Sequence, residues 1–142
     1  MNIVCAHCFA TNRVPESRDY TQAKCGKCQK SIYSSTPVVL GANTFYPYIE
    51  RNELPVIVDF WAAWCGPCQQ MAPTFNKLAL NSPNLLFAKV NTEQVQQIAA
   101  DAGIRSLPTL AFFHKGKEID RISGALNESQ MKQWIMQSIS KL

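Results

Sequence analysis

The sequence of 142 residues contains no long apolar run and few charged residues. No stretch approaches the roughly 20 apolar residues that a membrane-spanning helix requires. The first residues lack a basic segment followed by an apolar run, so we expect no secretory signal. The net charge of +4 is small and scattered along the chain. We therefore expect neither a membrane nor a nucleic acid as a partner.

Aromatic residues, by contrast, are plentiful. Three Trp, seven Phe and four Tyr supply enough apolar side chains for a hydrophobic core, which argues against disorder of the whole chain. A chain of this length is expected to form one globular domain, or one domain with a small appendage.

All six cysteines occur in Cys-x-x-Cys pairs, namely Cys5/Cys8, Cys25/Cys28 and Cys65/Cys68. An even number of cysteines is compatible with a secreted disulfide scaffold. Such scaffolds rarely place every cysteine two residues from a partner, and no secretory signal is expected here. The pattern therefore favours metal binding or thiol redox chemistry.

The distribution of charge and cysteine divides the chain near Pro37. Residues 1–37 hold five basic and two acidic residues, four of the cysteines and only eight large apolar or aromatic residues. A segment of this size lies below the roughly 40 residues at which a chain usually folds without a metal, disulfides or a partner. Residues 34–37 are typical of a linker. We predict a zinc-binding module with its linker at 1–37 and a larger domain at 38–142.

The four N-terminal cysteines follow the pattern C-x2-C-x16-C-x2-C, a spacing found in zinc ribbons. Each Cys-x-x-Cys turn lets two thiolates point at one ion, and four soft thiolates in a closed tetrahedral shell suit structural Zn²⁺. Binding would also supply the folding free energy that the short segment lacks. Two disulfides or an iron–sulfur centre are the alternatives, and His7 is a possible substitute ligand. The predicted zinc ligands are Cys5, Cys8, Cys25 and Cys28.

From Val38 onward, apolar patterns alternate between those of strands and those of helices. The run at 56–61 is nearly continuously apolar, as expected for a central strand that is covered on both faces. The order is β-α-β-α-β-α-β-β-α, which predicts a mixed sheet with helices on both faces. The expected strands are 38–40, 56–61, 85–90, 109–113 and 118–123, and the expected helices lie near 45–49, 65–80, 95–102 and after Asn127.

The last of these helices has a capping box, with Asn127 as the cap and Gln130 three residues later. Apolar residues at helical spacing predict one packing face for it, formed by Met131, Trp134, Ile135, Ser138, Ile139 and Leu142.

The third cysteine pair lies between the predicted central strand and the helix that follows it. At a helix N-terminus the free N–H groups and the macrodipole favour a negative charge, so the Cys65 thiol is expected to ionise easily. Cys68 is close enough to attack a mixed disulfide formed at Cys65. Pro67 lacks an N–H group and fits the first helical turn. A Cys-x-x-Cys can also be half of a metal site, but this strand–helix setting favours redox chemistry.

The residues around this pair resemble the thioredoxin family. The segment 58–68 reads VDFWAAWCGPC, and the segments GIRSLPT at 103–109 and Gly124-Ala125 match two further family signatures in the same order. The resemblance covers about 38–142 and implies the thioredoxin fold. A zinc module preceding such a domain resembles the zinc-containing thioredoxin 2 proteins of bacteria, over essentially the whole chain.

The resemblance implies a role for each matching residue. Cys65 would be the exposed nucleophile and Cys68 the shielded resolving thiol. Asp59 matches the buried acid that helps to move the proton of Cys68, and burial should raise its pKa. Lys89 matches the lysine near that acid. Pro108 matches a cis-proline beside the disulfide.

A flat apolar groove for an extended substrate segment is also implied. Its residues would be Trp64, Gly66, Pro67, Leu107, Gly124 and Ala125. The Gly-Pro interior of the motif resembles that of reductants. Gln69 departs from the family, in which a basic residue often follows the second cysteine.

We therefore predict a cytoplasmic protein-disulfide reductase, active as a monomer and without a bound organic cofactor. By resemblance, an NADPH-dependent flavoprotein, thioredoxin reductase, would regenerate the dithiol. A zinc-dependent chaperone or adaptor, or a disulfide oxidase or isomerase, is the alternative. We also hypothesise that oxidation of the zinc thiolates releases Zn²⁺ and alters substrate choice, although a structural clip is the simpler reading.

Overall fold

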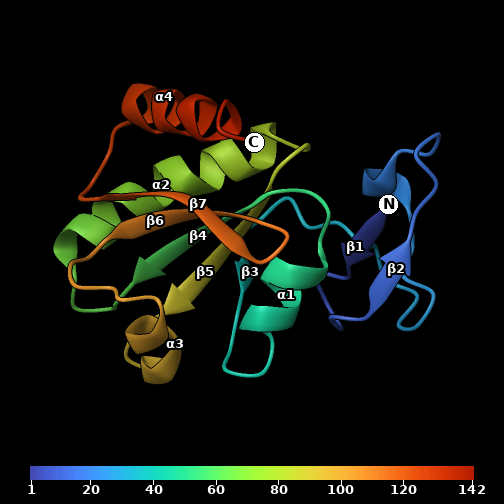
Figure 1. Cartoon of the computed structure of the whole chain (residues 1–142), viewed down its shortest axis with the longest axis horizontal. Coiled ribbons are helices and arrows are strands. Elements are labelled where there is room, and N and C mark those ends of the chain that lie inside the picture. Colours follow the sequence, from blue (N-terminus) through green and yellow to red (C-terminus); the bar gives the residue numbers. More distant parts are fainter.

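Strand β4 (Val56–Trp61) lies at the centre of a five-stranded mixed sheet in the computed structural model, which describes residues 1–142. The strand order is β3-β5-β4-β6-β7 (Figure 1). The strands β3 (Val38–Val39), β5 (Leu86–Asn91) and β4 are parallel, whereas β6 (Thr109–His114) and β7 (Lys117–Ser123) form an antiparallel hairpin. Both the predicted element order and the predicted mixed sheet are confirmed.

Two pairs of helices cover the two faces of this sheet (Figure 1). Helices α1 (Phe45–Arg51) and α3 (Gln96–Asp101) pack on one face. Helices α2 (Gly66–Asn81) and α4 (Glu128–Ile139) pack on the other. Side chains of a strand alternate between faces, so Val58 joins the core under α1 while Ile57 joins the core under α2. The central strand is thus buried on both sides. None of the helices has the length and apolar composition that spanning a membrane requires.

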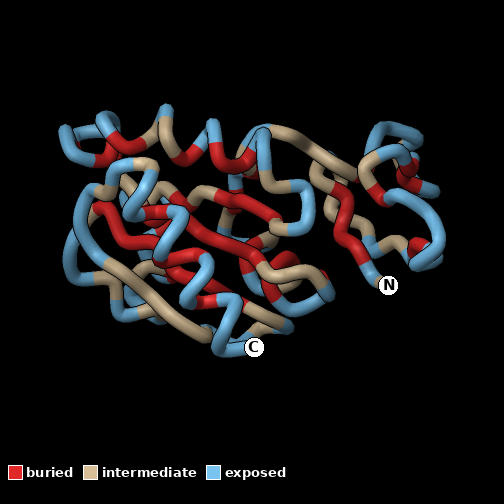
Figure 2. Tube along the Cα trace, turned by 90° about the horizontal axis from the view of Figure 1, so that it is seen from above, coloured by how far each residue is buried: buried red, intermediate tan, exposed pale blue.

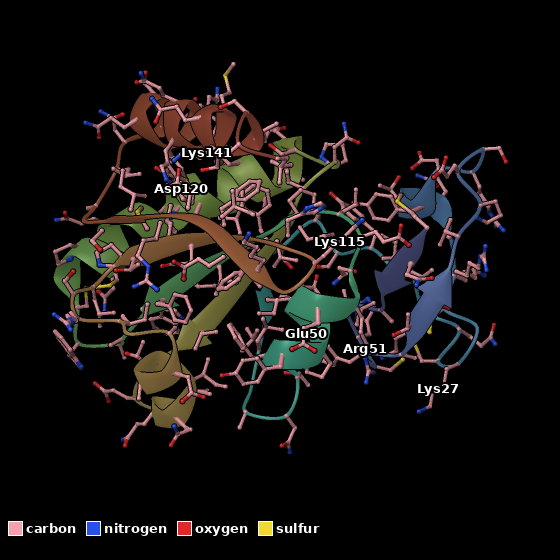
Figure 3. All side chains as sticks on the ribbon, viewed as in Figure 1. Lys27, Glu50, Arg51, Lys115, Asp120 and Lys141 are labelled. Atoms are coloured by element: carbon pink, nitrogen blue, oxygen red, sulfur yellow. A yellow bond between two sulfur atoms is a disulfide. The ribbon has the colours of Figure 1, made fainter.

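Helix α4 begins with the predicted capping box, in which Asn127 and Gln130 exchange side-chain and backbone hydrogen bonds. Its other end is fixed by Asp120 of β7, whose carboxylate accepts hydrogen bonds from Ser138 and from Lys141 at 2.9 Å (Figure 3). The predicted packing face is correct only as far as Ser138. Ile139 and Leu142 are 42% and 54% exposed, because the helix ends at Ile139 and Leu142 follows it.

The N-terminal part has only two short strands, β1 (Asn2–Val4) and β2 (Thr11–Arg13), and one turn of 3₁₀ helix, η1 (Tyr20–Gln22). It lies to one side of the sheet, next to α1 (Figure 1). Its buried residues do not form a separate core. They belong to a cluster of 23 buried residues that also contains residues of α1, β3, β4 and β5. Figure 2 shows buried positions in both parts of the chain, and the membership of the cluster shows that the two parts share one core.

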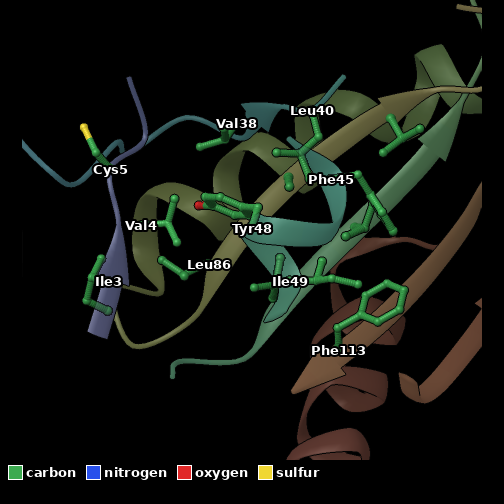
Figure 4. Close-up of a cluster of buried hydrophobic side chains, with 14 of the residues drawn as sticks. Ile3, Val4, Cys5, Val38, Leu40, Phe45, Tyr48, Ile49, Leu86 and Phe113 are labelled. Atoms are coloured by element: carbon green, nitrogen blue, oxygen red, sulfur yellow. The ribbon is translucent and has the colours of Figure 1, made fainter. Parts of the chain in front are cut away.

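This shared core is visible where β1 faces α1 (Figure 4). Ile3 and Val4 of β1 are 1% exposed and belong to the same cluster as Tyr48 of α1 and Leu86 of β5. The ring of Phe9 contacts the ring of Tyr48 edge to face, with 6.0 Å between centroids. Burial of apolar surface between the two parts therefore stabilises both of them.

Hydrogen bonds complete the joint between the two parts. The fully buried Asn52, just after α1, accepts the N–H of Val4 at 2.7 Å and donates to the carbonyl of Tyr48 at 2.8 Å. The N–H of Glu53 donates to the carbonyl of Asn2 at 3.0 Å. Tyr20 of η1 donates to the carbonyl of Pro83, in the loop before β5. One amide side chain, that of Asn52, thus links β1 to the end of α1.

Replacing Asn52 with Ala tests this link. The substitution leaves the N–H of Val4 and the carbonyl of Tyr48 buried without partners, so we expect a loss of about 2–3 kcal/mol in the free energy of unfolding. Urea unfolding measures the loss, with Asn43→Ala, at an exposed asparagine, as the control. Equal stability of the two variants would contradict the assigned role of Asn52.

Candidate functional site

A disulfide joins Cys65, in the short connection between β4 and α2, to Cys68, in the first turn of α2. Cys65 is the N-cap of α2, and its sulfur accepts the backbone N–H of Cys68 at 3.2 Å. Pro67 lies in the first turn, where the helix needs no N–H donor from it. The Cα atoms of the two cysteines are 5.3 Å apart, a normal separation for a bridged pair. The predicted pairing at a helix N-terminus is confirmed.

The expectation that Cys65 is exposed is wrong for this disulfide form. Cys65 is only 4% exposed and Cys68 is 2% exposed. The two bridged cysteines pack with Ala62 against the half-buried side chains of Trp61 and Leu107. The exposure difference expected between the two thiols is therefore almost absent here.

The surface around the disulfide contains most of the predicted groove residues. Trp64 is 71% exposed, Gly66 and Pro67 are exposed, and a side chain added at Gly66 would meet only open space. Trp64 and the half-buried Leu107 share a hollow of about 220 Å³ with Arg105. Large exposed apolar side chains beside a reactive group are typical of a binding surface.

A second loop borders the same region. The bond between Leu107 and Pro108 is cis, as expected, and Pro108 is buried. Gly124 and Ala125 are exposed, and the N–H of Gly124 donates to the carbonyl of Pro108 at 2.8 Å. Gly124 has a φ of +100°, a conformation that favours glycine. The Gly124 and Pro108 segments, 16 residues apart, are thus joined directly.

Asp59 lies in β4, where it is 1% exposed, and neither carboxylate oxygen has a hydrogen-bond partner. Burial raises its pKa to about 7, and the positive charge of Lys89, opposite it on β5, partly opposes this rise. The ammonium group of Lys89 lies 4.8 Å from the centre of the Trp61 ring. A carboxyl group with a pKa near neutrality can both accept and return a proton at physiological pH.

The four N-terminal cysteines converge on one point. Their sulfur atoms all lie within 4.8 Å of one another, with Cys5 and Cys28 separated by 3.7 Å and Cys8 and Cys25 by 3.6 Å. A tetrahedral ion with metal–sulfur bonds of about 2.3 Å holds its sulfurs about 3.8 Å apart. The cluster thus fits a metal ion bound by four thiolates.

The two Cys-x-x-Cys turns have the same backbone structure. In each, the N–H of the first cysteine donates to the carbonyl five residues later, Ala10 or Lys30, and a residue with positive φ, Phe9 or Gln29, closes the turn. A backbone N–H also donates to the first sulfur, from His7 to Cys5 and from Lys27 to Cys25, each at 3.4 Å. His7 is exposed and contributes its backbone to this turn, while the four sulfurs form the ligand group by themselves.

One residue near this cluster is not distinguished by the sequence pattern. Asn12, on β2, donates from its side-chain amide to the sulfur of Cys25 at 3.4 Å. Hydrogen bonds from the backbone of Cys28 and from Asn12 lower the pKa of the Cys25 thiol, whereas burial raises that of Cys5. The only sequence signal was an amide residue located between the two cysteine pairs.

Comparison with known families gives two matches. Residues 36–137 match the family model described as Thioredoxin. Residues 4–30 match the zinc-ribbon model described as Thioredoxin 2, N-terminal. The two matches correspond to the five-stranded sheet with its helices and to the four-cysteine cluster.

Individual relatives show the same division. Thioredoxin C-3 from Corynebacterium nephridii is 41% identical over 141 residues, which cover 99% of this chain and 97% of that protein. Thioredoxin from Porphyra purpurea is 39% identical, over 68% of this chain and 92% of its own length. The solved structure of Fasciola hepatica thioredoxin has a TM-score of 0.65 at 39% identity and covers 70% of this chain and 97% of its own. That of Plasmodium falciparum thioredoxin has a TM-score of 0.66 at 34% identity, over 70% and 96%.

Replacing Asp59 with Asn removes a buried group whose ionisation opposes folding. Its pKa is about 7 in the folded protein and near its ordinary value of 3.8 in the unfolded chain, so wild-type stability falls as the pH rises from about 4 to about 7. We expect Asp59→Asn to exceed wild type in unfolding free energy by up to about 4 kcal/mol at pH 8. The gain should vanish near pH 4.

Urea unfolding at both pH values measures this difference. The control is Glu93→Gln, which neutralises an exposed carboxylate. An equal gain for Asp59→Asn at both pH values would show that the substitution acts through packing and not through ionisation.

Proposed function

Because the chain belongs to the thioredoxin family and carries the N-terminal zinc ribbon of thioredoxin 2, we propose that it reduces disulfides of protein substrates through Cys65 and Cys68. It is a thiol–disulfide oxidoreductase, and membership of the family implies protein substrates. The observation that carries the proposal is the Cys65–Cys68 bridge at the start of α2, directly after the strand that contains the buried, unpaired carboxyl group of Asp59.

In the reduced protein, the thiolate of Cys65 is the nucleophile. The positive end of the α2 dipole and the N–H of Cys68 stabilise its negative charge. The thiolate attacks one sulfur of the substrate disulfide. A bond forms between Cys65 and that sulfur, and the substrate S–S bond breaks. The other sulfur of the substrate disulfide leaves as a thiolate.

The second step uses Cys68 and Asp59. The Asp59 carboxylate accepts the proton of the Cys68 thiol, a role that its pKa of about 7 and its lack of hydrogen-bond partners permit. The Cys68 thiolate then attacks the Cys65 sulfur. The Cys65–Cys68 disulfide forms as the bond from Cys65 to the substrate breaks. The substrate sulfur that Cys65 had attacked leaves and takes up a proton. Two electrons have passed from the protein to the substrate.

We assign substrate binding to the exposed surface around the disulfide. Trp64, Gly66 and Pro67 would contact the substrate on one side, and Leu107, Gly124 and Ala125 on the other. The exposure of Trp64 and the direct link between the Gly124 and Pro108 segments support this assignment. Pro108 would position the substrate backbone beside the sulfurs.

Each cycle leaves the protein oxidised, so an external donor of two electrons is required. We assign this part to an NADPH-dependent flavoprotein, thioredoxin reductase, and place the monomeric chain in the cytoplasm without a bound organic cofactor. The Gly-Pro interior of the motif, which resembles that of reductants, supports reduction as the physiological direction.

We further propose that the four-cysteine cluster binds one structural Zn²⁺, through Cys5, Cys8, Cys25 and Cys28. The tetrahedral fit of the sulfurs and the zinc-ribbon match support this metal. When bound, the ion supplies folding free energy to a module with little apolar surface of its own. We place the boundary between this module and the thioredoxin domain after residue 37, one residue before β3 begins.

Serine substitutions test the roles of the redox cysteines. Reduction of insulin with NADPH and thioredoxin reductase should fall to the uncatalysed rate in Cys65→Ser, which lacks the nucleophile. Cys68→Ser should also lose turnover but should accumulate a mixed disulfide with the substrate, detectable on a non-reducing gel.

Gln70→Ser, an exposed position on α2, is the control and should keep full activity. Undiminished reduction by Cys65→Ser would contradict the proposed nucleophile. Suppression of aggregation by a double serine variant, with no loss relative to wild type, would favour a chaperone instead.

Metal analysis tests the zinc assignment. We expect one zinc per chain and, in the reduced protein, two thiols that react rapidly and four that react only after a chelator is added. Cys25→Ser should lose the metal, while Cys65→Ser should retain it. Iron in place of zinc, or six thiols of equal reactivity, would contradict the assignment.

A further inference from the structure

Asn12 is the one side chain that hydrogen-bonds to a sulfur of the four-cysteine cluster from outside it. Its Nδ2 donates to Cys25 Sγ at 3.4 Å and to the carbonyl of Ala10 at 3.2 Å. Its Oδ1 accepts the N–H of Gly26 at 3.0 Å. A single amide therefore contacts the end of the first Cys-x-x-Cys turn and two residues of the second.

The orientation of this amide follows from its partners. The N–H of Gly26 can only donate, so the oxygen of the Asn12 side chain must face it. A rotated amide would place that oxygen against two acceptors, the sulfur of Cys25 and the carbonyl of Ala10. The network thus fixes the N–H of Asn12 toward the sulfur.

The four sulfurs differ in their donors as a consequence. Each of Cys5 and Cys25 accepts backbone N–H donors from its own turn, such as those of His7 and Lys27, but Cys25 alone also accepts a side-chain donor, the amide of Asn12. The sulfurs of Cys8 and Cys28 accept no N–H group and lie 3.6 Å from the sulfur of Cys25 and 3.7 Å from that of Cys5, respectively. The two turns otherwise share one backbone design, so Asn12 is what distinguishes the second from the first.

We propose that Asn12 is a positioning residue of the metal centre, which holds the Cys25 thiolate in its binding orientation and stabilises its charge. The inference rests on the zinc site proposed above. Four thiolates around a divalent ion carry a net charge of about −2, which an N–H donor at a sulfur reduces. Groups that hold metal ligands in place from outside the ligand shell contribute about 10- to 100-fold in metal affinity.

A measurement on the unaltered chain tests the contact directly. The full-length protein, labelled with ¹⁵N and loaded with ¹¹³Cd²⁺ in place of zinc, should show a scalar coupling between one side-chain amide proton of Asn12 and the metal. Such a coupling passes through the hydrogen bond and the Cys25 sulfur. Its absence, with the backbone amide of Lys27 showing one, would overturn the proposal without any substitution.

Variants measure the effect on the metal. Asn12→Asp keeps an oxygen for the N–H of Gly26 but cannot donate to Cys25, and Asn12→Leu removes both contacts at similar volume. Both should bind Zn²⁺ about 10- to 100-fold more weakly than wild type in competition with a chromophoric chelator. With Co²⁺ bound, both should shift the thiolate-to-cobalt charge-transfer band, which a change in fold stability alone would leave in place.

The matched control is Gln29→Glu, which makes the same amide-to-acid change at a residue that donates to the carbonyl of Gly26 and to no sulfur. It should retain wild-type affinity and the wild-type cobalt band. Equal affinity and band position in Asn12→Asp, Gln29→Glu and wild type would overturn the role of Asn12 while leaving the zinc site intact. A wild-type chain that binds none of the three metals would overturn both proposals.

Discussion

The redox chemistry of this protein depends on the burial of β4 from both faces. Helices on each side remove the strand from water, so its one carboxyl group, that of Asp59, lies without a hydrogen-bond partner. The same strand ends where α2 begins, and the cysteine pair is placed at that junction. One structural element thus fixes the position of the disulfide and the burial that raises the pKa of Asp59.

The zinc-ribbon part depends on this framework in a different way. Its own apolar residues are too few for a core, and they are buried against α1 and β5. The cluster of cysteines holds its two turns together, while Asn52 and Tyr20 hold the module to the sheet. The cysteine cluster and the docking contacts therefore both act on the same short segment.

Much of this arrangement could be predicted from short sequence patterns. The spacing of the N-terminal cysteines, the apolar run of β4 and the capping box of Asn127 are local features, and each one determines a local structure. The docking of the two parts could not be predicted in this way. It depends on two hydrogen bonds between residues that are far apart in sequence. Asn52 binds Val4, 48 positions away, and Tyr20 binds Pro83, 63 positions away, and neither side chain belongs to a recognisable motif.

Three further features depend on context that no sequence pattern contains. Cys65 is buried in a cluster that includes Leu107, which is more than 40 residues away in sequence. Ile139 is exposed at the last residue of α4, although its helical spacing is regular. The contact of Asn12 with Cys25 requires the fold of both turns to be known first.

The shared core has a consequence for how this chain can be divided. A cut between residue 30, where one family match ends, and residue 36, where the other begins, would expose to water the apolar side chains of Tyr48 and Leu86, which β1 and its neighbours now cover. The isolated larger part would then expose an apolar surface that favours aggregation, which single-domain relatives need not have. The full chain, and not the larger part alone, is consequently the unit that keeps these side chains buried.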